Sequence, residues 1–273
     1  MKIYRTVDIL NKLENCIEYK KPFSHIRFGD GGIKFIHSIL FNDKKQLDII
    51  IKKEGIPRSK LVEVFELWGY YARRADFIDT PEVYFQDTFW DRTRAPGKPI
   101  TEKTEFKLKM WKDLYSRSEF DNENYCNPES NYLMITKIRE NKTLIDIMKD
   151  KKLCMITAKP KVKDNLKKFD VDIVEIVGHY KNQYKNSFHG VVDRIEKTAK
   201  DYDFWLVAAG ELGRVYSGII KENGGRTVDI GFIAEFWLGQ DIHPRLTSFL
   251  RRGWDEPLEL QLTFVGKKYE EYI

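Results

Sequence analysis

The sequence predicts an α/β fold, a largely parallel sheet flanked by helices, with a helical N-terminal portion. Two observations lead to this prediction. From about residue 150 onward, short apolar runs alternate with segments of helical periodicity, which is typical of parallel strands joined by helices. Before that point, apolar residues recur at helical spacing around one early strand, so residues 1 to about 80 are expected to cover a sheet.

Length and composition indicate a folded, soluble, intracellular protein. The 273 residues are 42% hydrophobic and 33% charged, enough to bury a sizeable core as a single domain over 1–273, with halves at 1–150 and 151–273. No apolar stretch reaches the length of a membrane span and the N-terminus lacks a secretory pattern, so we expect a cytoplasmic location. The formal charge of +5 permits an anionic ligand without requiring nucleic acid.

The reactive side chains form none of the common catalytic or metal-binding motifs. Cys16, Cys126 and Cys154 lie far apart without a CxxC pair, which fits reduced thiols. The histidines show no HxH or HExxH spacing, which disfavours a histidine-bound metal. His179 follows an apolar run and is placed to touch a ligand, although an ordinary surface position is the commoner case. Without a GxSxG elbow or a P-loop, serine hydrolases and P-loop NTPases are excluded.

A glycine-rich stretch, "RFGDGG" at residues 27–32, follows the first predicted strand. Residues 25–28 alternate polar and apolar like a strand, and the apolar residues from Ile33 onward open a buried helix. The glycines between them allow a tight turn that a ligand can approach closely, with helix amides facing a phosphate. Asp30 is then either a metal ligand beside phosphates or a cap of the helix, and spacing alone favours the cap.

In the second half, four apolar runs predict four strands: "KLCMIT", "VDIVEIV", "DFWLVAAG" and "RTVDIG". Helices are predicted between them at "PKVKDNLKKF", "FHGVVDRIEKTAKDY" and "LGRVYSGIIKENG", the last ending at a glycine pair. Ligands of parallel sheets bind beyond the carboxyl ends of the strands. The informative residues are therefore those that follow the runs, at 157–159, 210–211 and 229–235.

Four stretches, in this order along the chain, carry a likeness to a known family: "IRFGDGG", "KLCMITAKPKVKDNL", "FWLVAAGELGRVYSGIIKENGG" and "RTVDIGFIAEFW". Together they resemble the GT-D type glycosyltransferases, whose domain was first described as one of unknown function. The likeness is thin but extends over about the whole chain. It implies a Rossmann-like, GT-D-like fold and a hexosyl- or pentosyltransferase that moves a sugar from a nucleotide-sugar donor to an acceptor hydroxyl.

The resemblance also implies a donor site at the predicted strand ends and a divalent metal, Mn2+ or Mg2+, beside the diphosphate. The expected donor-binding residues are Arg27, Gly29, Asp30, Gly31, Lys159, Gly210, Glu211 and Gly213, with Asp30 as the metal ligand. Family members carry Asp-x-Glu in the first turn, but here Gly32 takes the place of the glutamate. A hard cation needs several oxygens, so a single carboxylate depends on donor and water oxygens and holds the metal more weakly.

Three explanations stay open for the missing glutamate. In the first, Asp30 works alone. In the second, another carboxylate such as Glu211 or Asp91 fills in. In the third, basic residues such as Arg27 and Lys159 neutralise the leaving diphosphate in place of a metal.

The acceptor hydroxyl must lose a proton as it attacks the anomeric carbon, which requires a base within hydrogen-bond reach. Glu235 is the first candidate, because it follows a strand end and loosely matches an acidic position of the family's corresponding segment. The alternative for Glu235 is an ordinary solvated acid. Asp229 is the second candidate, and its alternative is a carboxylate that caps its turn or binds a ribose hydroxyl.

Two other classes of function remain as alternatives. The turn "AAGELG", with Asp229 after it, imitates the glycine turn and ribose acid of a nucleotide-cofactor enzyme, a methyltransferase or oxidoreductase. Its glycine pattern is GxxG and it lies in the last strand-helix-strand unit, which argues against that class. A non-catalytic sugar-nucleotide or nucleic-acid binder is the other alternative, favoured by the missing acid at Gly32.

The sequence leaves the acceptor, the donor's base and sugar, the stereochemical outcome and the oligomeric state open. A protein-linked glycan, a polysaccharide precursor and a modified DNA base are all compatible acceptors. The basic segments 90–100 and 245–254 lean toward an anionic or nucleic-acid acceptor.

Overall fold

The computed structural model describes residues 2–4, 6–27, 29–79, 124–126, 134, 136–137, 142–231, 233–238 and 261–262. The basic segments 90–100 and 245–254, and Asp91 with them, lie outside the described residues.

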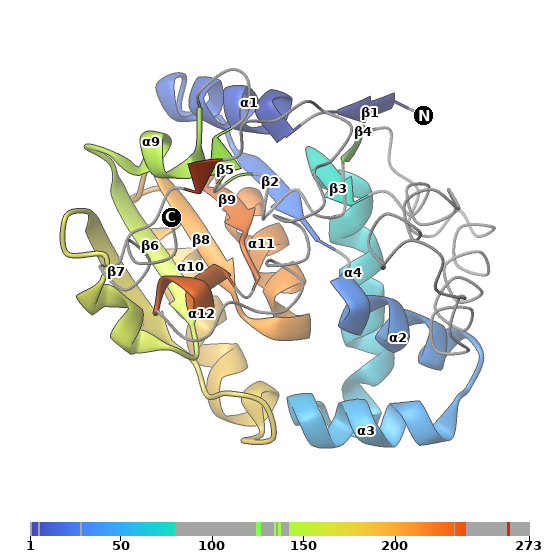
Figure 1. Ribbon diagram of the computed structural model, residues 1–273. Helices are drawn as coiled ribbons and strands as arrows, with labels where there is room; N and C mark the ends of the chain where they lie inside the picture. The colour runs from blue at the N-terminus through green and yellow to red at the C-terminus, as the bar shows by residue number, and fades with distance from the viewer. Residues whose placement is uncertain are drawn as a thin grey trace, which may run out of the picture.

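Eight strands form one sheet in which every neighbouring pair is parallel (Figure 1). In spatial order they are β1 (Lys2–Tyr4), β4 (Asn124–Cys126), β3 (Phe77–Asp79), β2 (Phe23–Ile26), β9 (Arg226–Asp229), β8 (Phe204–Ala208), β6 (Lys152–Thr157) and β7 (Asp170–Glu175). Two short strands, β5 (Thr136–Lys137) and β10 (Gln261–Leu262), pair antiparallel apart from this sheet. The predicted α/β fold with a parallel sheet is confirmed.

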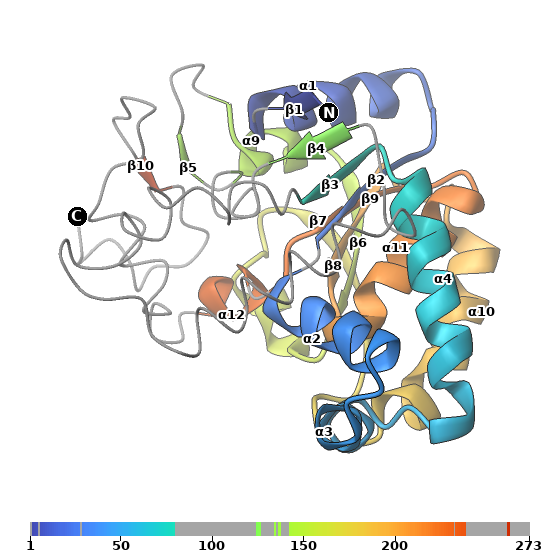
Figure 2. The same ribbon diagram turned by 90° about the vertical axis from the view of Figure 1, so that its right-hand side faces the viewer.

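Helices cover both faces of the sheet, because successive residues of each buried strand point to opposite sides. One face, called here the α11 face, carries α2 (Gly29–Leu40), α3 (Lys44–Glu54), α4 (Leu61–Arg74), α10 (His189–Thr198) and α11 (Gly213–Glu222). The opposite face, the α1 face, carries α1 (Thr6–Glu18), α9 (Leu144–Met148), α12 (Ile233–Trp237) and the 3-10 turn η3 (Pro160–Asp164). Figure 2 shows α4, α10 and α11 together on one side, away from α1 and α9.

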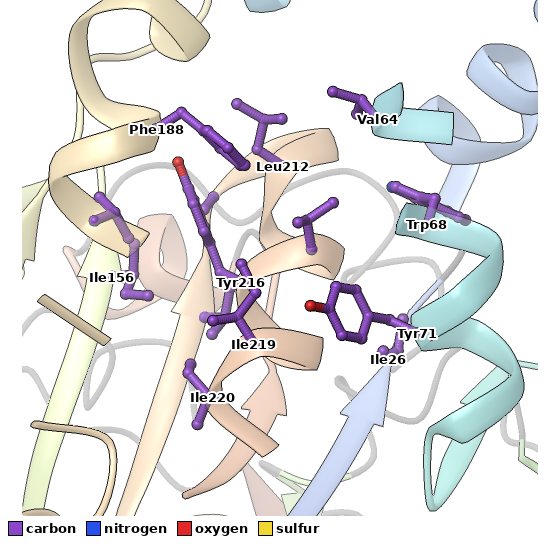
Figure 3. Packing of buried hydrophobic residues seen from close by; sticks show 14 of the residues in the cluster. Ile26, Val64, Trp68, Tyr71, Ile156, Phe188, Leu212, Tyr216, Ile219 and Ile220 are labelled. Atoms are coloured by element: carbon purple, nitrogen blue, oxygen red, sulfur yellow. The ribbon is translucent and has the colours of Figure 1, made fainter. Parts of the chain in front are cut away.

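Each face has its own hydrophobic core. On the α11 face, α11 lies between α4 and α10, and its residues from 213 to 220 are all buried. Figure 3 shows Trp68 and Tyr71 of α4 facing the α11 side of this core, where Tyr216 and Ile219 lie. Three shorter elements complete this side: η1 (Arg58–Lys60), the π-helical turn η4 (Tyr184–Phe188) and η5 (Gly210–Leu212).

Two predicted elements differ from the structure. The segment "PKVKDNLKKF" forms only the 3-10 turn η3, because the chain must reach β7 at Asp170 while Val162 and Leu166 stay buried in the core. The glycine-rich stretch is helical from Gly29, so the tight turn expected there is wrong. The predicted end of α11 is confirmed, since Gly224 follows it with a φ of +81°.

In the part of the chain that the structure describes, no helix has both the length and the apolar character that crossing a bilayer demands.

Candidate functional site

The carboxyl ends of β2, β9, β8 and β6 lie next to one another at one edge of the sheet, and the connections leaving them part to opposite faces. After β2 and β8 the chain enters helices of the α11 face, and after β9 and β6 it enters elements of the α1 face. Such parting points are where open parallel sheets bind ligands. Every predicted site residue ends or follows one of these four strands: Arg27, Gly29, Asp30 and Gly31; Asp229 and Glu235; Gly210, Glu211 and Gly213; and Lys159.

Arg214 is the centre of a buried polar cluster on the α11 face. Its Nε donates a 2.7 Å hydrogen bond to the carbonyl of Arg27, and its Nη1 donates to the carbonyl of Gly210. Nη1 also lies 3.4 Å from Glu211 Oε2, and the guanidinium lies 5.5 Å from the centre of the Trp68 ring. Trp68 donates from Nε1 to the carbonyl of Glu211 at 3.0 Å. These contacts fix the ends of β2 and β8 against α4.

Asp229 is buried beside this cluster. Its Oδ1 accepts a 3.0 Å hydrogen bond from the Gly231 amide, and its Oδ2 lies 3.9 Å from Arg214 Nε. Only 4% of the residue is exposed. Asp229 therefore caps its own turn, which was one of the two alternatives to a catalytic role.

Gly32 of α2 lies against the Trp68 ring of α4. A Cβ at this position would be 2.5 Å from Trp68 Cη2 and 3.4 Å from Glu211 Oε2. The buried indole fills the space that a glutamate at residue 32 would need. The departure from the family pattern therefore has a packing reason in this chain, and a carboxylate, that of Glu211, lies beside the same point.

Gly29, Asp30 and Gly31 form the start of α2, which begins two residues earlier than a cap at Asp30 requires, so the predicted cap is wrong. The direction of the Asp30 side chain lies outside what the structure describes. No group of three or more His, Cys, Asp or Glu side chains suited to a metal occurs among the described residues. The described part of the chain thus supplies no complete set of protein ligands for Mn2+ or Mg2+.

Lys159 and Glu235 meet on the other side of the edge. Lys159 follows β6 and Glu235 lies in α12, after β9; these two strands flank β8. Lys159 Nζ lies 3.9 Å from Glu235 Oε1, and the side chains are 40% and 49% exposed. This open pair of opposite charges contrasts with the buried cluster around Arg214.

Two glycines after β8 have different reasons to be glycine. Gly210 has a φ of +58°, and a Cβ there would lie 2.8 Å from His179 Cε1. Gly213 has an ordinary φ, but its Cβ would lie 3.1 Å from Val207 Cγ1, so it packs helix against strand. Gly210 thus keeps the backbone turned at the edge, and Gly213 serves packing.

Glu54, the last residue of α3, was not singled out from the sequence. Its side chain is fully buried, with Oε1 3.1 Å from His179 Nδ1 and 3.2 Å from Lys53 Nζ. Lys53 Nζ is also 4.0 Å from Glu211 Oε1. The sequence signal for Glu54 is weak, because it looks like any charged residue in the last turn before a terminating glycine.

The two buried glutamates respond to this environment in opposite directions. Burial works to raise the pKa of Glu54, but hydrogen bonding and charge from His179 and Lys53 together lower it below its usual range. Burial raises the pKa of Glu211, with the nearby Glu54 adding to the rise and Arg214 opposing it. The negative charge is therefore held mainly by Glu54.

No protein-family model matches the chain, and no curated protein does. Two solved structures are similar to it. One is of the domain of unknown function 1792, described as having a distinct glycosyltransferase fold. The match covers 99% of this chain and 94% of the solved structure's chain, with 18% sequence identity and a TM-score of 0.57. A selenomethionine-substituted structure of that domain matches with 17% identity, the same coverage and a TM-score of 0.58. This chain has a glycosyltransferase fold. The resemblance to the GT-D type glycosyltransferases is confirmed at the level of the fold.

Proposed function

We propose that the protein is a glycosyltransferase that moves a hexose or pentose from a nucleotide-sugar donor to an acceptor hydroxyl. The observation that carries the proposal is the exposed Lys159–Glu235 pair. In a glycosyltransferase fold, it brings a cation and a carboxylate together at the edge where ligands of such sheets bind. Sugar transfer needs both charges, a cation for the leaving diphosphate and a base for the attacking hydroxyl.

In this proposal the donor diphosphate lies over Gly210 and the start of α2. Gly210, Gly29 and Gly31 leave the backbone approachable, and Arg27 and Lys159 neutralise charge on the leaving nucleoside diphosphate. Glu211 and Gly213 support the Gly210 turn from the interior of the protein, since both residues are buried. A Mn2+ or Mg2+ ion at Asp30 would take most of its ligands from the donor and from water, and would neutralise charge on the diphosphate.

Glu235 is proposed as the base. Its carboxylate accepts the hydroxyl proton as the oxygen bonds to the anomeric carbon and the bond to the diphosphate breaks. Asp229 is the less suitable of the two candidates, because its two oxygens face Gly231 and Arg214. The same contacts weigh against a nucleotide-cofactor enzyme, whose ribose acid must face the ligand.

Two further parts of the proposal concern the surroundings of the enzyme. A cytoplasmic location is supported by the free, buried thiols of Cys16, Cys126 and Cys154. The acceptor is proposed only as a hydroxyl-bearing molecule, because the basic segments that suggested nucleic acid lie outside the described residues.

The proposal is tested with a panel of nucleotide-sugars, each incubated with the protein with and without Mn2+. We expect at least one donor to raise the melting temperature and to release its nucleoside diphosphate slowly, since water replaces the missing acceptor. A panel in which no donor binds and none is hydrolysed would overturn the glycosyltransferase proposal. A donor that binds without any hydrolysis or transfer would favour the non-catalytic binder.

A further inference from the structure

Glu54 and His179 form a pair in which only one partner reaches the surface. The Glu54 side chain is 0% exposed, whereas that of His179 is 45% exposed. Glu54 Oε1 lies 3.1 Å from Nδ1, so the carboxylate lies against one nitrogen of the imidazole ring, and Nε2 is the nitrogen on the other side of the ring.

The loop that carries His179 is held rigidly in place. The Tyr180 amide donates to the carbonyl of Lys53 at 2.7 Å, and the Gln183 side chain donates to the carbonyl of Ala209 at 3.0 Å. The backbone of Asn182 packs directly on Gly55, where a Cβ would lie 2.3 Å from Asn182 Cα. The loop is thereby tied both to the end of α3 and to the turn after β8.

His179 lies at the proposed donor site. A Cβ built on Gly210, the residue with the positive φ just after β8, would lie 2.8 Å from His179 Cε1. Gly178, the residue before it, approaches Ala158 beyond the end of β6. The ring thus stands at the edge between the β8 and β6 connections, the same place at which Lys159 leaves β6.

Neutralising Glu54 does not by itself explain this arrangement. Lys53 Nζ already lies 3.2 Å from Glu54 Oε1, so the buried carboxylate has a cationic partner on its own helix. A histidine needed only for charge compensation would gain from being buried with its partner, because solvent weakens the attraction between exposed charges. Here the ring is instead 45% exposed.

We infer that His179 binds the diphosphate of the donor beside Gly210, with Glu54 as the positioning residue that orients the imidazole. This inference rests on the proposed function and adds a residue to its donor site. His179 then supplies one charged hydrogen bond to a phosphate oxygen, and Lys53 contributes positive charge nearby.

The test measures binding of nucleoside diphosphates and of inorganic pyrophosphate by calorimetry, which needs no acceptor. The variants are His179→Asn, Glu54→Gln and, as a matched control, Lys181→Ala, an exposed residue of the same loop. We expect His179→Asn to weaken nucleoside diphosphate binding by about tenfold or more. Glu54→Gln should weaken binding by a smaller factor, and Lys181→Ala should leave it unchanged. A melting curve accompanies each variant, because a purely structural histidine would lower stability and leave affinity intact.

The outcomes separate this inference from the proposed function. If a nucleoside diphosphate binds the wild type and His179→Asn equally well, the role of His179 is overturned while the donor site survives. If no probe binds the wild type and no nucleotide-sugar is hydrolysed, both fail. If His179→Asn binds normally but transfers or hydrolyses slowly, the diphosphate contact is wrong and the ring acts on a proton instead.

Discussion

The carboxyl edge of the sheet has two sides that differ in how much water reaches their charges. On the α11 side, Arg214 and Glu211 are 8% and 4% exposed; Arg214 contacts a backbone carbonyl and the Trp68 ring, and the Glu211 carbonyl accepts from Trp68 Nε1. On the α1 side, the side chains of Lys159 and Glu235 are 40% and 49% exposed and meet only loosely, at 3.9 Å. Charge on the first side holds the strand ends in place, and charge on the second side is free to meet a ligand. Substitutions on the two sides should therefore have opposite signatures, in stability and in activity.

The largest effect is expected from Arg214→Ala. Removing the guanidinium leaves the buried Asp229 without its cationic partner and removes the donor to the Arg27 and Gly210 carbonyls, which should lower the free energy of unfolding by about 3–5 kcal/mol. Urea denaturation measures this loss. The matched control is Arg58→Ala, since Arg58 pairs with Asp48 in the open and should contribute no more than about 1 kcal/mol. An equal loss of unfolding free energy in the two variants would show that the buried charges of the α11 side contribute no more to stability than an exposed ion pair.

Glu235→Gln should have the opposite signature. Because Glu235 is exposed, the melting temperature should stay near that of the wild type. If the carboxylate takes the acceptor proton, turnover under saturating donor and acceptor should fall about a hundredfold or more, while donor affinity is retained. Asp229→Asn is the companion variant, and turnover lost there but kept in Glu235→Gln would transfer the base role to Asp229.

A smaller change in stability is expected from Gly32→Ala on the packed side. The added Cβ would lie 2.5 Å from the buried Trp68 ring, and such overpacking typically costs about 1–3 kcal/mol. Gly190→Ala in α10 is the control, because a Cβ there has nothing within 4 Å and should stabilise the helix by about 0.5–1 kcal/mol. Thermal unfolding of both variants gives the comparison. A Gly32→Ala protein as stable as Gly190→Ala would mean that the Trp68 side chain shifts at little cost to make room for the Cβ.

The smallest change in stability is expected from Lys159→Ala. An exposed ion pair contributes about 0–1 kcal/mol, so the free energy of unfolding should barely move. Affinity for the nucleoside diphosphate should nevertheless fall, by about tenfold, because a cation beside the leaving group is lost. Calorimetric titration of folded protein checks both parts, and unchanged affinity would remove Lys159 from the donor site.

The strand-helix alternation after residue 150 was enough to predict the parallel sheet, because each apolar run and each glycine turn is a local feature of the chain. The same locality explains why Lys159, Gly210 and Glu235 could be placed at strand ends. The order of the strands was not predictable in this way. Pairing of β2 with β9 joins Phe23 to Arg226, and no local pattern encodes a contact at that distance along the chain.

Glu54 and Arg214 were missed for a similar reason. Each looks like an ordinary charged residue of an amphipathic helix, and only tertiary packing buries it. The proposed role of Glu54 depends on its contact with His179, which lies in the loop after β7 and is distant in sequence. The role of Gly32 was equally hidden, because the indole that fills its side-chain space comes from α4.

The position of β9 in the middle of the sheet has a consequence for folding of the chain during its synthesis on the ribosome. Since β9 lies between β2 and β8, a nascent chain that has not yet passed Asp229 holds two half-sheets with unpaired edges facing each other. Parallel pairing between distant segments is slow, and open strand edges are prone to aggregate. Translation must therefore pass Asp229 before the sheet can close, and the chain should benefit from chaperones that shield those edges during synthesis.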